Sequence, residues 1–237
     1  MTDVTSWKQR HRSLYYASAP EPEDPLIDPA TTALLVIDVQ NTYLERPERD
    51  DLVSEAERAH YDAWTHFHRR MHEIVIPNIA ETISFFRARS MECLFVRIAC
   101  ATQDGRERSL SQKKPGFNNL LLPKDEHASQ IVPALAPQGD EIVVIKTTDS
   151  ALTGTNLRLI LNNLGISTVV CVGIFTDQCV SSTVRSLADE SFDVLVLEDC
   201  CAAASDALHL HELAVINMIY GHVMRRDEFK ALLTDPR

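Results

Sequence analysis

The stretch Val169-Val170-Cys171-Val172-Gly173-Ile174-Phe175-Thr176-Asp177-Gln178-Cys179-Val180 decides how the rest of the chain is arranged. Its first half is apolar and rich in β-branched residues, a pattern typical of a strand buried on both faces. Gly173 ends this strand, and Thr176 or Asp177 is expected to cap the helix that follows. Cys179 then lies in the first helical turn, where free backbone N–H groups and the helix dipole favour a thiolate. The sequence therefore predicts Cys179 as a nucleophile.

Five more apolar segments alternate with helical patterns along the 237-residue chain. Their composition predicts strands that are buried within a sheet. The segments are Ala33–Ile37, Cys93–Ala99, Glu141–Ile145, Val194–Leu197 and His222–Met224. Amphipathic patterns predict helices over residues 50–90, from about Thr153 to Asn163, and after Ser205. This alternation predicts an α/β fold, a three-layer α/β/α sandwich around a mainly parallel six-stranded sheet of the Rossmann type.

Residues 1–31 differ in character from the rest of the chain. They are polar and contain four prolines, which disfavour regular structure: Pro20, Pro22, Pro25 and Pro29. We expect an irregular N-terminal arm over 1–31 that packs on a neighbouring subunit. Residues 32–237 are expected to form a single domain.

The composition argues against several classes of protein. Hydrophobic residues make up 45% of the chain, enough for one sizeable core. The formal net charge of −11 argues against a nucleic-acid partner. No apolar run is as long as a membrane span and the start lacks a secretory pattern, so no membrane partner is expected. The six cysteines show no metal-binding spacing, and we expect most to be buried thiols in a reducing, cytoplasmic setting.

Three chemically complementary residues lie where apolar strands stop: Asp38, Lys146 and Cys179. The carboxyl ends of parallel strands lie at one edge of a sheet, so these side chains can converge if their strands are neighbours. Lys146 would favour the thiolate, and Asp38 would accept the proton of the thiol. Taken alone, Asp38 is more typical of a turn cap and Lys146 of a surface lysine. Their equivalent positions together predict an active site.

The segment 102–137 is long and carries a cluster of basic residues: Arg106, Arg108, Lys113 and Lys114. One interpretation is that the segment covers the site and meets an anionic substrate group. The other is a solvated charge run. Lys113 and Lys114 are also rivals of Lys146 for the role of catalytic amine, although neither ends a strand.

Four histidines lie within the helical pattern over 50–90: His60, His66, His68 and His72. His68 and His72 are four residues apart and would share one helix face. No H-E-x-x-H pattern or nearby carboxylate completes a metal site, so we interpret all four as solvated or partly packed.

Three blocks of the sequence together resemble the isochorismatase-like cysteine hydrolases. They are Ala33–Asn41, Val144–Ala151 and Gly173–Val180, and the resemblance extends from about Thr32 to the C-terminus. It implies that Asp38, Lys146 and Cys179 form a catalytic triad. It also implies a cis peptide before Phe175, with the backbone N–H groups of Phe175 and Cys179 as an oxyanion hole.

The resemblance implies a cysteine-dependent amidohydrolase. Such an enzyme would cleave a C–N bond in a small linear amide or ureide of the biuret, ureidoacrylate or N-carbamoyl type, through a thioester, with release of ammonia or an amine. The nicotinamidase branch of the family binds a metal through an Asp-x-His pattern. Residues 45–60 lack that pattern, so we expect no metal and no other cofactor. Members are commonly oligomers, so a homodimer or homotetramer is expected.

Four residues are predicted to line the substrate pocket and contact the substrate: Tyr43, Thr147, Phe175 and Thr176.

Two other functions are considered as alternatives to amide hydrolysis. One alternative is an isochorismatase-type vinyl-ether hydrolase, which relies on the aspartate and needs no nucleophilic cysteine. A second is a thiol redox or sensor protein that uses Cys179 without hydrolysis. Dinucleotide binding is not expected, since no G-x-G-x-x-G follows the first strand.

Overall fold

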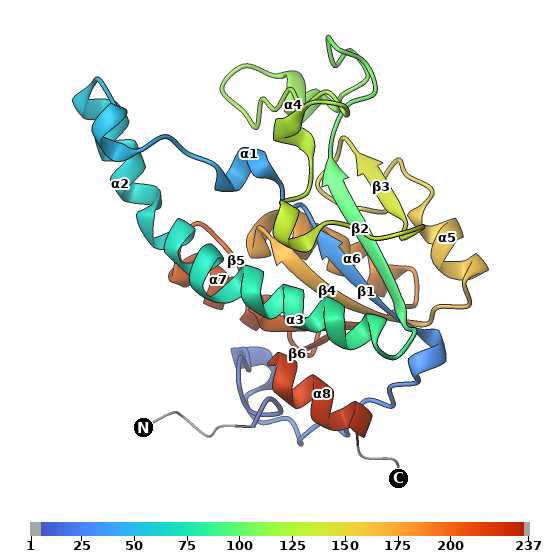
Figure 1. Ribbon diagram of the computed structural model, residues 1–237. Coiled ribbons are helices and arrows are strands. Elements are labelled where there is room, and N and C mark those ends of the chain that lie inside the picture. Colours follow the sequence, from blue (N-terminus) through green and yellow to red (C-terminus); the bar gives the residue numbers. More distant parts are fainter. Residues whose placement is uncertain (1–5, 235–237) are drawn as a thin grey trace.

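The computed structural model describes residues 6–234 and has one sheet between two layers of helices (Figure 1). The six strands are all parallel and lie in the order β3-β2-β1-β4-β5-β6. Their bounds are β1 (Thr32–Ile37), β2 (Glu92–Ile98), β3 (Val143–Lys146), β4 (Thr168–Ile174), β5 (Asp193–Ala202) and β6 (His222–Met224). The predicted α/β/α sandwich is therefore confirmed.

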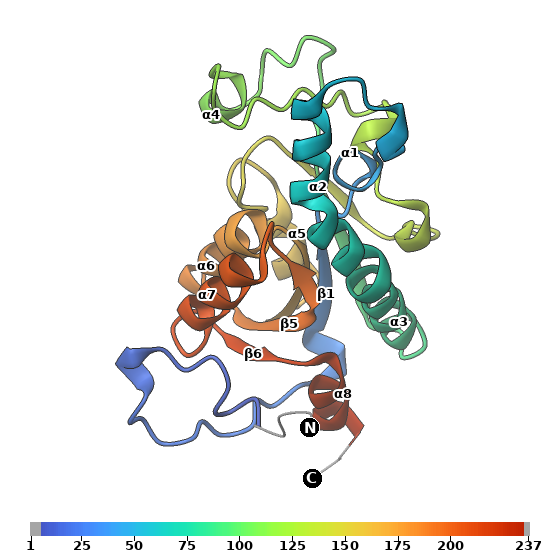
Figure 2. The same ribbon diagram turned by 90° about the vertical axis from the view of Figure 1, so that its left-hand side faces the viewer.

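Helices cover both faces of the sheet, as the view in Figure 2 shows. One face carries α2 (Glu55–Arg70), α3 (Ile76–Arg87) and α8 (Arg226–Thr234), and the other carries α5 (Leu157–Asn163), α6 (Ser181–Asp189) and α7 (Asp206–Ile216). The short helices α1 (Asn41–Leu44) and α4 (Leu110–Lys113) lie beyond the carboxyl ends of the strands. Among the described helices, none combines the length and the apolarity that a membrane crossing requires.

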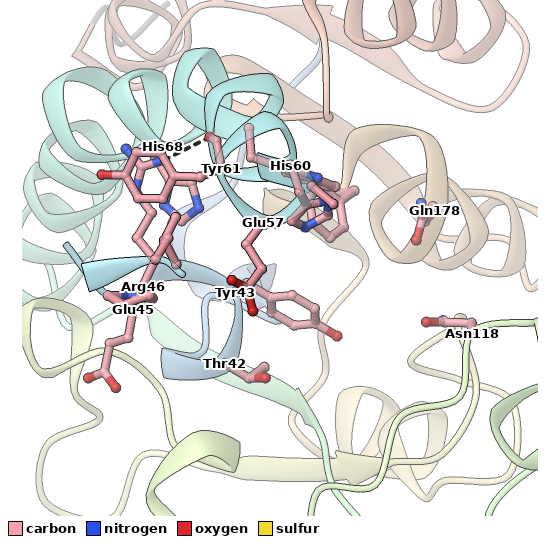
Figure 3. Close-up of a pocket in the computed structure, with 15 residues that line it drawn as sticks. Thr42, Tyr43, Glu45, Arg46, Glu57, His60, Tyr61, His68, Asn118 and Gln178 are labelled. Atoms are coloured by element: carbon pink, nitrogen blue, oxygen red, sulfur yellow. Dashed lines mark hydrogen bonds between the residues drawn. The ribbon is translucent and has the colours of Figure 1, made fainter. Parts of the chain in front are cut away.

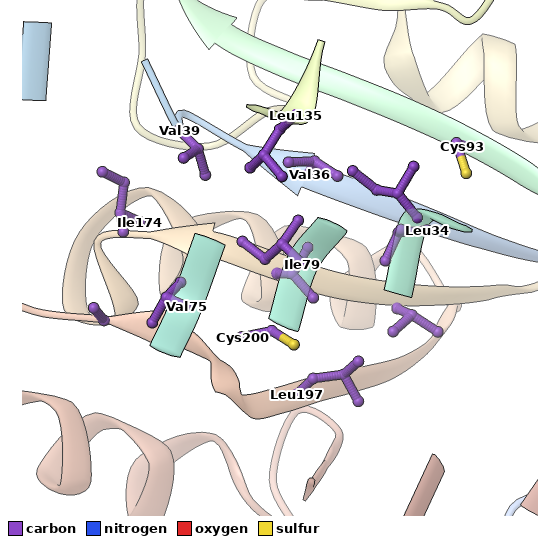
Figure 4. Close-up of a cluster of buried hydrophobic side chains, with 14 of the residues drawn as sticks. Leu34, Val36, Val39, Val75, Ile79, Cys93, Leu135, Ile174, Leu197 and Cys200 are labelled. Atoms are coloured by element: carbon purple, nitrogen blue, oxygen red, sulfur yellow. The ribbon is translucent and has the colours of Figure 1, made fainter. Parts of the chain in front are cut away.

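Successive residues of a strand enter opposite faces of the sheet, so each strand contributes to two cores. In β1, Leu34 and Val36 join the cluster that includes Ile79 of α3, part of which is drawn in Figure 4. Leu35 and Ile37 point to the other cluster, with residues of α5, α6 and α7. All six residues of β1 are buried. Burial on both faces explains why these strands are continuous apolar runs rather than alternating ones.

Several element boundaries differ from the sequence prediction, and β4 ends at Ile174 rather than at Gly173. The helix expected from Thr153 begins only at Leu157, because side-chain hydrogen bonds hold the preceding residues in a loop; one of them runs from the Thr155 hydroxyl to the Ala151 carbonyl. The third strand includes Lys146. The fifth strand continues past Glu198, because its pairing with β4 resumes after a register shift.

The helical pattern over 50–90 forms two helices in one continuous run. Ser54 caps α2 in a reciprocal capping box with Glu57. A π-helical turn, Met71–Val75, leads into α3, and Pro77 lies in the first turn of α3, where a proline is tolerated. Ser205 is the N-cap of α7, and its side chain accepts the N–H of Leu208.

The described part of the N-terminal arm packs on its own chain. Trp7 is buried and its ring makes a T-shaped contact with His222 of β6. Arg10 forms an ion pair with Glu198 of β5, and Nε2 of His11 contacts the same carboxylate. In both views this arm lies with β6 and α8, away from α1 and α4. The expected contact with a neighbouring subunit stays a prediction.

Gly173 marks the closest approach between the two central strands. Its φ is +120°, and a Cβ atom there would lie 2.0 Å from the carbonyl oxygen of Ile37, the last residue of β1. Only glycine has no Cβ and adopts such a φ freely. This close approach brings together the two strand ends that precede Asp38 and Cys179.

We expect Gly173→Ala to destabilise the protein by at least about 2 kcal/mol, because the new methyl group meets backbone atoms at a φ that alanine avoids. The measurement is urea unfolding followed by fluorescence. Gly154→Ala is the matched control, since Gly154 has a φ of +75° but open space around the missing Cβ. A loss no larger than that of Gly154→Ala would contradict the role given to Gly173.

Candidate active site

Asp38 directly follows β1 and departs sharply from the strand. Its φ is +54°, an uncommon value for a residue with a side chain, and its N–H donates to the carbonyl of Val96 at 2.9 Å. The turn directs the carboxylate over the end of the sheet, where it is only 1% exposed. Asp38 is therefore a buried acid rather than a solvated cap.

Lys146 comes from the edge strand β3, with β2 between it and β1. The strands of the predicted triad are therefore not all neighbours, and the four-carbon stem of Lys146 spans the gap. Its Nζ lies 2.7 Å from Oδ2 of Asp38 and 3.2 Å from Sγ of Cys179. A third bond goes to the carbonyl of Thr148 at 2.9 Å. The structure thus brings the three predicted residues together at one point.

The rival lysines lie elsewhere. Lys113 donates to the carbonyl of Arg106, and the ammonium of Lys114 lies over the ring of Phe117. Neither contacts Asp38 or Cys179 through an interaction found among residues 6–234. Lys146 is the amine at this site.

Cys179 lies in a π-helical turn, Thr176–Val180, that precedes α6. Phe175 is the N-cap and neither Thr176 nor Asp177 caps the helix, so that prediction was wrong. The Thr176 hydroxyl contacts Nδ1 of His209 instead. Placement of Cys179 in the first turn, after a central strand, is as expected.

Burial sets the protonation of the triad. It raises the pKa of the Asp38 carboxyl, although the charge of Lys146 opposes this. Burial and then the charge of Asp38 raise the pKa of the Cys179 thiol well above its ordinary value. Burial tends to lower the pKa of Lys146, but the charges of Asp38 and Cys179 and the hydrogen bonds to both residues together outweigh burial, and the pKa is raised. The thiol of Cys179 is therefore protonated near neutral pH, because burial and the charge of Asp38 oppose the thiolate that the helix start favours.

The turn before Cys179 has the backbone form that the resemblance implies. The peptide bond between Ile174 and Phe175 is cis. The Phe175 carbonyl accepts the N–H groups of Gln178 at 3.0 Å and Val180 at 3.2 Å, which closes the turn around Cys179. The N–H groups of Phe175 and Cys179 remain the candidates for an oxyanion hole.

Gln40 is a supporting residue that sequence reasoning passed over. It is fully buried, its amide oxygen accepts the N–H of Ile98, and its amide nitrogen donates to the carbonyls of Ile98 and Ser129, each at 2.8 Å. These bonds tie the chain after Asp38 to the end of β2. The available signal was its position, two residues after Asp38 in the block Ala33–Asn41.

Two cavities meet at the site. A small inner chamber of about 30 Å³ is bounded by Asp38 and Cys179. An outer cavity of about 780 Å³, whose lining residues are drawn in Figure 3, shares four of its lining residues with this chamber. The larger cavity does not touch the triad. Four residues line both spaces and separate them: Tyr43, Asn118, Phe175 and Gln178. The inner chamber has room for little more than a water molecule, so a substrate must displace some of these side chains.

The predicted pocket walls are found in part. Tyr43 and Phe175 line both cavities, and burial together with the charge of Asp38 raises the pKa of Tyr43, which keeps its hydroxyl protonated. Thr176 is buried behind the turn, and Thr147 lines neither cavity. Asn118 and Gln178 were missed, because nothing in their local sequence distinguishes them from other polar residues.

The segment 102–137 contributes Asn118 to the cavity, but none of its four clustered basic residues lines it. Of the histidines over 50–90, His60 and His68 line the outer cavity, and His66 pairs with Asp206. Burial, followed by the charge of Arg46, lowers the pKa of His68 to about 4. Within residues 6–234, no three His, Cys, Asp or Glu side chains are grouped so that they could hold a metal ion.

A parallel sheet with an acid, an amine and a thiol at its carboxyl edge defines the class of this protein. Residues 32–228 match the family described as "Isochorismatase domain", and the chain belongs to that family of hydrolases.

The chain is similar to several named proteins along most of its length. The chain is 30% identical to ureidoacrylate amidohydrolase RutB of Methylobacterium radiotolerans, across 96% of this chain and 88% of the relative. It is 27% identical to an isochorismatase family protein of Burkholderia thailandensis, with a TM-score of 0.70 over 89% and 99% of the two chains. The N-carbamoylsarcosine amidase of Thermoplasma acidophilum shares the fold, with a TM-score of 0.62 and 22% identity over 83% and 97%.

We expect Lys146→Met to destabilise the protein by about 3–5 kcal/mol near neutral pH, because it leaves the Asp38 carboxylate buried without its partner. Losing the ammonium raises the pKa of Asp38 further above its unfolded value, so the folded variant takes up a proton as pH falls. The difference in free energy of unfolding between wild type and the variant should therefore be smaller at about pH 5 than at about pH 7.5.

Urea unfolding of both proteins at the two pH values measures this effect. Lys124→Met is the control, since Lys124 is exposed, and it should change stability by less than about 0.5 kcal/mol. A deficit that does not depend on pH would argue against Asp38 as the group left unpaired.

Proposed function

We propose that this protein is a cysteine-dependent amidohydrolase that cleaves a C–N bond in a small linear amide or ureide. The observation that carries the proposal is the position of the Lys146 Nζ, within 2.7 Å of Asp38 and 3.2 Å of Cys179 Sγ. A base, a cation and a thiol in contact are the groups that nucleophilic attack on an amide carbonyl requires. The relatives named as ureidoacrylate amidohydrolases support the same class of reaction.

In the first half-reaction, the Asp38 carboxylate takes the proton of the Cys179 thiol as the sulfur attacks the carbonyl carbon. Its raised pKa makes Asp38 a stronger base than a solvated carboxylate. The carbonyl oxygen becomes an oxyanion that the N–H groups of Phe175 and Cys179 stabilise. Asp38 then gives its proton to the departing nitrogen, the C–N bond breaks, and an acyl thioester on Cys179 remains.

In the second half-reaction, Asp38 removes a proton from water, and the resulting hydroxide attacks the thioester carbonyl. The C–S bond breaks, and the sulfur recovers a proton from Asp38, so the triad returns to its starting state. Lys146 keeps one positive charge throughout and offsets the negative charge as it moves between Asp38, the sulfur and the oxyanion.

The two alternatives from the sequence fit this site less well. Sensor cysteines are typically accessible and of low pKa, whereas Cys179 is 4% exposed and its pKa is raised by burial. A vinyl-ether hydrolase needs no thiol, whereas here the sulfur is hydrogen-bonded within the triad. Trapping of a thioester on Cys179 would separate amide cleavage from both.

An ammonia-release screen tests the proposal directly. Biuret, triuret, ureidoacrylate, N-carbamoyl amino acids and nicotinamide form the panel. We expect at least one ureide to release ammonia, and Cys179→Ala to lower kcat by at least about 10³-fold with the fold intact. Circular dichroism checks the fold.

Cys93→Ala is the matched control for this experiment. Cys93 is also a buried free cysteine, but it lies near the amino end of β2, away from the carboxyl edge that holds the triad. Its replacement should leave kcat unchanged. Turnover that persists in Cys179→Ala, or a panel from which wild type releases no ammonia, would refute the proposed function.

The outer cavity supports a narrower substrate class, a ureide or amide whose far end carries a carboxylate. Arg46 lines this cavity on the side opposite Asn118 and Gln178 (Figure 3), and its guanidinium lies 3.8 Å from the centre of the Tyr61 ring. It donates to the carbonyl of Tyr61 at 3.3 Å. Stacking holds the planar group in place while leaving other N–H donors available for an anion.

The two acidic residues that line the outer cavity have other partners than Arg46. Glu45 contacts His127, and Glu57 accepts the backbone N–H groups of Val53 and Ser54. Among residues 6–234, no ion pair joins Arg46 to a carboxylate. Arg46, rather than the basic cluster of the segment 102–137, is therefore the cation that lines this cavity.

We expect Arg46→Gln to reduce kcat/KM for 3-ureidopropionate by about 10–100-fold and to change kcat/KM for its uncharged methyl ester by less than about threefold, the size expected for one charge-assisted hydrogen bond. Arg49→Gln is the matched control, since Arg49 pairs with Asp62 outside the cavity. An equal loss of kcat/KM for the acid and for the ester would show that Arg46 does not bind the substrate carboxylate.

A further inference from the structure

A buried polar contact lies directly behind the turn that carries the proposed oxyanion donors. Thr176 follows Phe175 and is completely buried, and its hydroxyl oxygen lies 2.8 Å from Nδ1 of His209. His209 projects from α7 and is itself 3% exposed. Sequence reasoning placed Thr176 in the substrate pocket and gave His209 no role.

The partner on the other side of the ring fixes the tautomer of His209. Nη2 of Arg70 lies 3.1 Å from Nε2 of His209 and also donates to the carbonyls of Cys201 at 3.2 Å and Glu198 at 3.4 Å. A guanidinium can only donate, so Nε2 must accept and cannot carry a proton. Burial, followed by the charge of Arg70, lowers the pKa of His209 to about 4, so the ring is neutral near neutral pH. Its one proton is therefore on Nδ1, which donates to the Thr176 hydroxyl.

We propose that His209 is a positioning residue for the reaction, holding Thr176 and thereby the Phe175 peptide in the orientation that stabilises the oxyanion. This inference rests on the proposed function. Arg70 anchors the ring from α2, and α7 holds it from the opposite helical layer, so the turn is braced from both faces of the sheet. His209 touches neither the substrate cavity nor the triad, and it acts only through Thr176.

A purely structural histidine would make a different prediction. Its loss would lower the free energy of unfolding and leave kcat of the folded fraction unchanged. A positioning residue lowers kcat with KM almost unchanged, because a misplaced oxyanion donor weakens the transition state more than substrate binding. Comparing the change in kcat with the change in free energy of unfolding therefore distinguishes a positioning histidine from a purely structural one.

The experiment measures kcat, KM and unfolding for four single variants and one double variant, on the ureide that wild type cleaves best. We expect His209→Ala and Thr176→Val each to lower kcat by about 10–100-fold with KM within about twofold, an effect smaller than removal of an oxyanion donor itself. Thr176→Ser keeps the hydroxyl and should retain kcat within about threefold of wild type. The double variant, His209→Ala with Thr176→Val, should lose no more than either single change.

His211→Ala is the matched control. It removes a second histidine from the same helix, two positions away, where the side chain is exposed. It should leave kcat and stability unchanged.

Full kcat in folded His209→Ala, or additive losses in the double variant, would overturn the inference. If His209→Ala does not fold, the comparison of kcat between Thr176→Val and Thr176→Ser tests the inference instead. Equal kcat values in these two variants would also overturn the role of His209. Absence of ammonia release by wild type would overturn the proposed function along with it, whereas an active wild type with an unaffected His209→Ala overturns only the role of His209.

Discussion

The buried contact of Lys146 with Asp38 and Cys179 is the constraint on which the rest of the structure depends. Two opposite charges removed from water are tolerable only when they touch each other and find further hydrogen bonds. Here Lys146 also donates to the Thr148 carbonyl. The ammonium must reach across β2 from the edge of the sheet, so the spacing and register of four strands all bear on the distance between three side-chain atoms.

Backbone geometry at the ends of β1 and β4 delivers the acid and the thiol. Gly173 permits a close approach to Ile37 that a side chain would prevent. Asp38 turns away from the strand at a positive φ, and Gln40 bonds to both the N–H and the carbonyl of Ile98. The neighbouring strand end is thereby satisfied although regular pairing has stopped. The precision of the site thus comes from backbone contacts at the edge of the sheet.

Packed aromatic rings lie between the outer cavity and the triad. Phe175 makes ring contacts with Tyr43, Trp64 and Phe67, at centroid distances of 5.5, 6.0 and 5.1 Å. The first two rings also line the outer cavity. The same cluster therefore fixes the turn before Cys179 and keeps water from the triad, which strengthens the electrostatic interactions inside. The charged residues Glu45, Arg46 and Glu57 line the outer cavity and not the inner chamber.

The sequence by itself determined which residues carry the proposed chemistry: an acid, a lysine and a cysteine, each located where a buried apolar strand ends. It also determined the α/β/α architecture, because strands buried on both faces must be continuous apolar runs. These are local signals, readable from consecutive residues. The same reasoning named Tyr43, just after the first block, and Phe175, within the third, and both residues line the two cavities.

Only the tertiary structure decided which distant groups meet. The bridging of β2 by Lys146, the braces made by Gln40 and His209, and the contributions of Asn118, Gln178 and Arg46 depend on contacts between residues far apart in the chain. The protonation of Cys179 was decided there too. Its place near a helix start favours the thiolate, but the loss of water around three packed groups and the adjacent Asp38 charge outweigh that effect. Desolvation is a property of the assembled fold, which no short stretch of sequence carries.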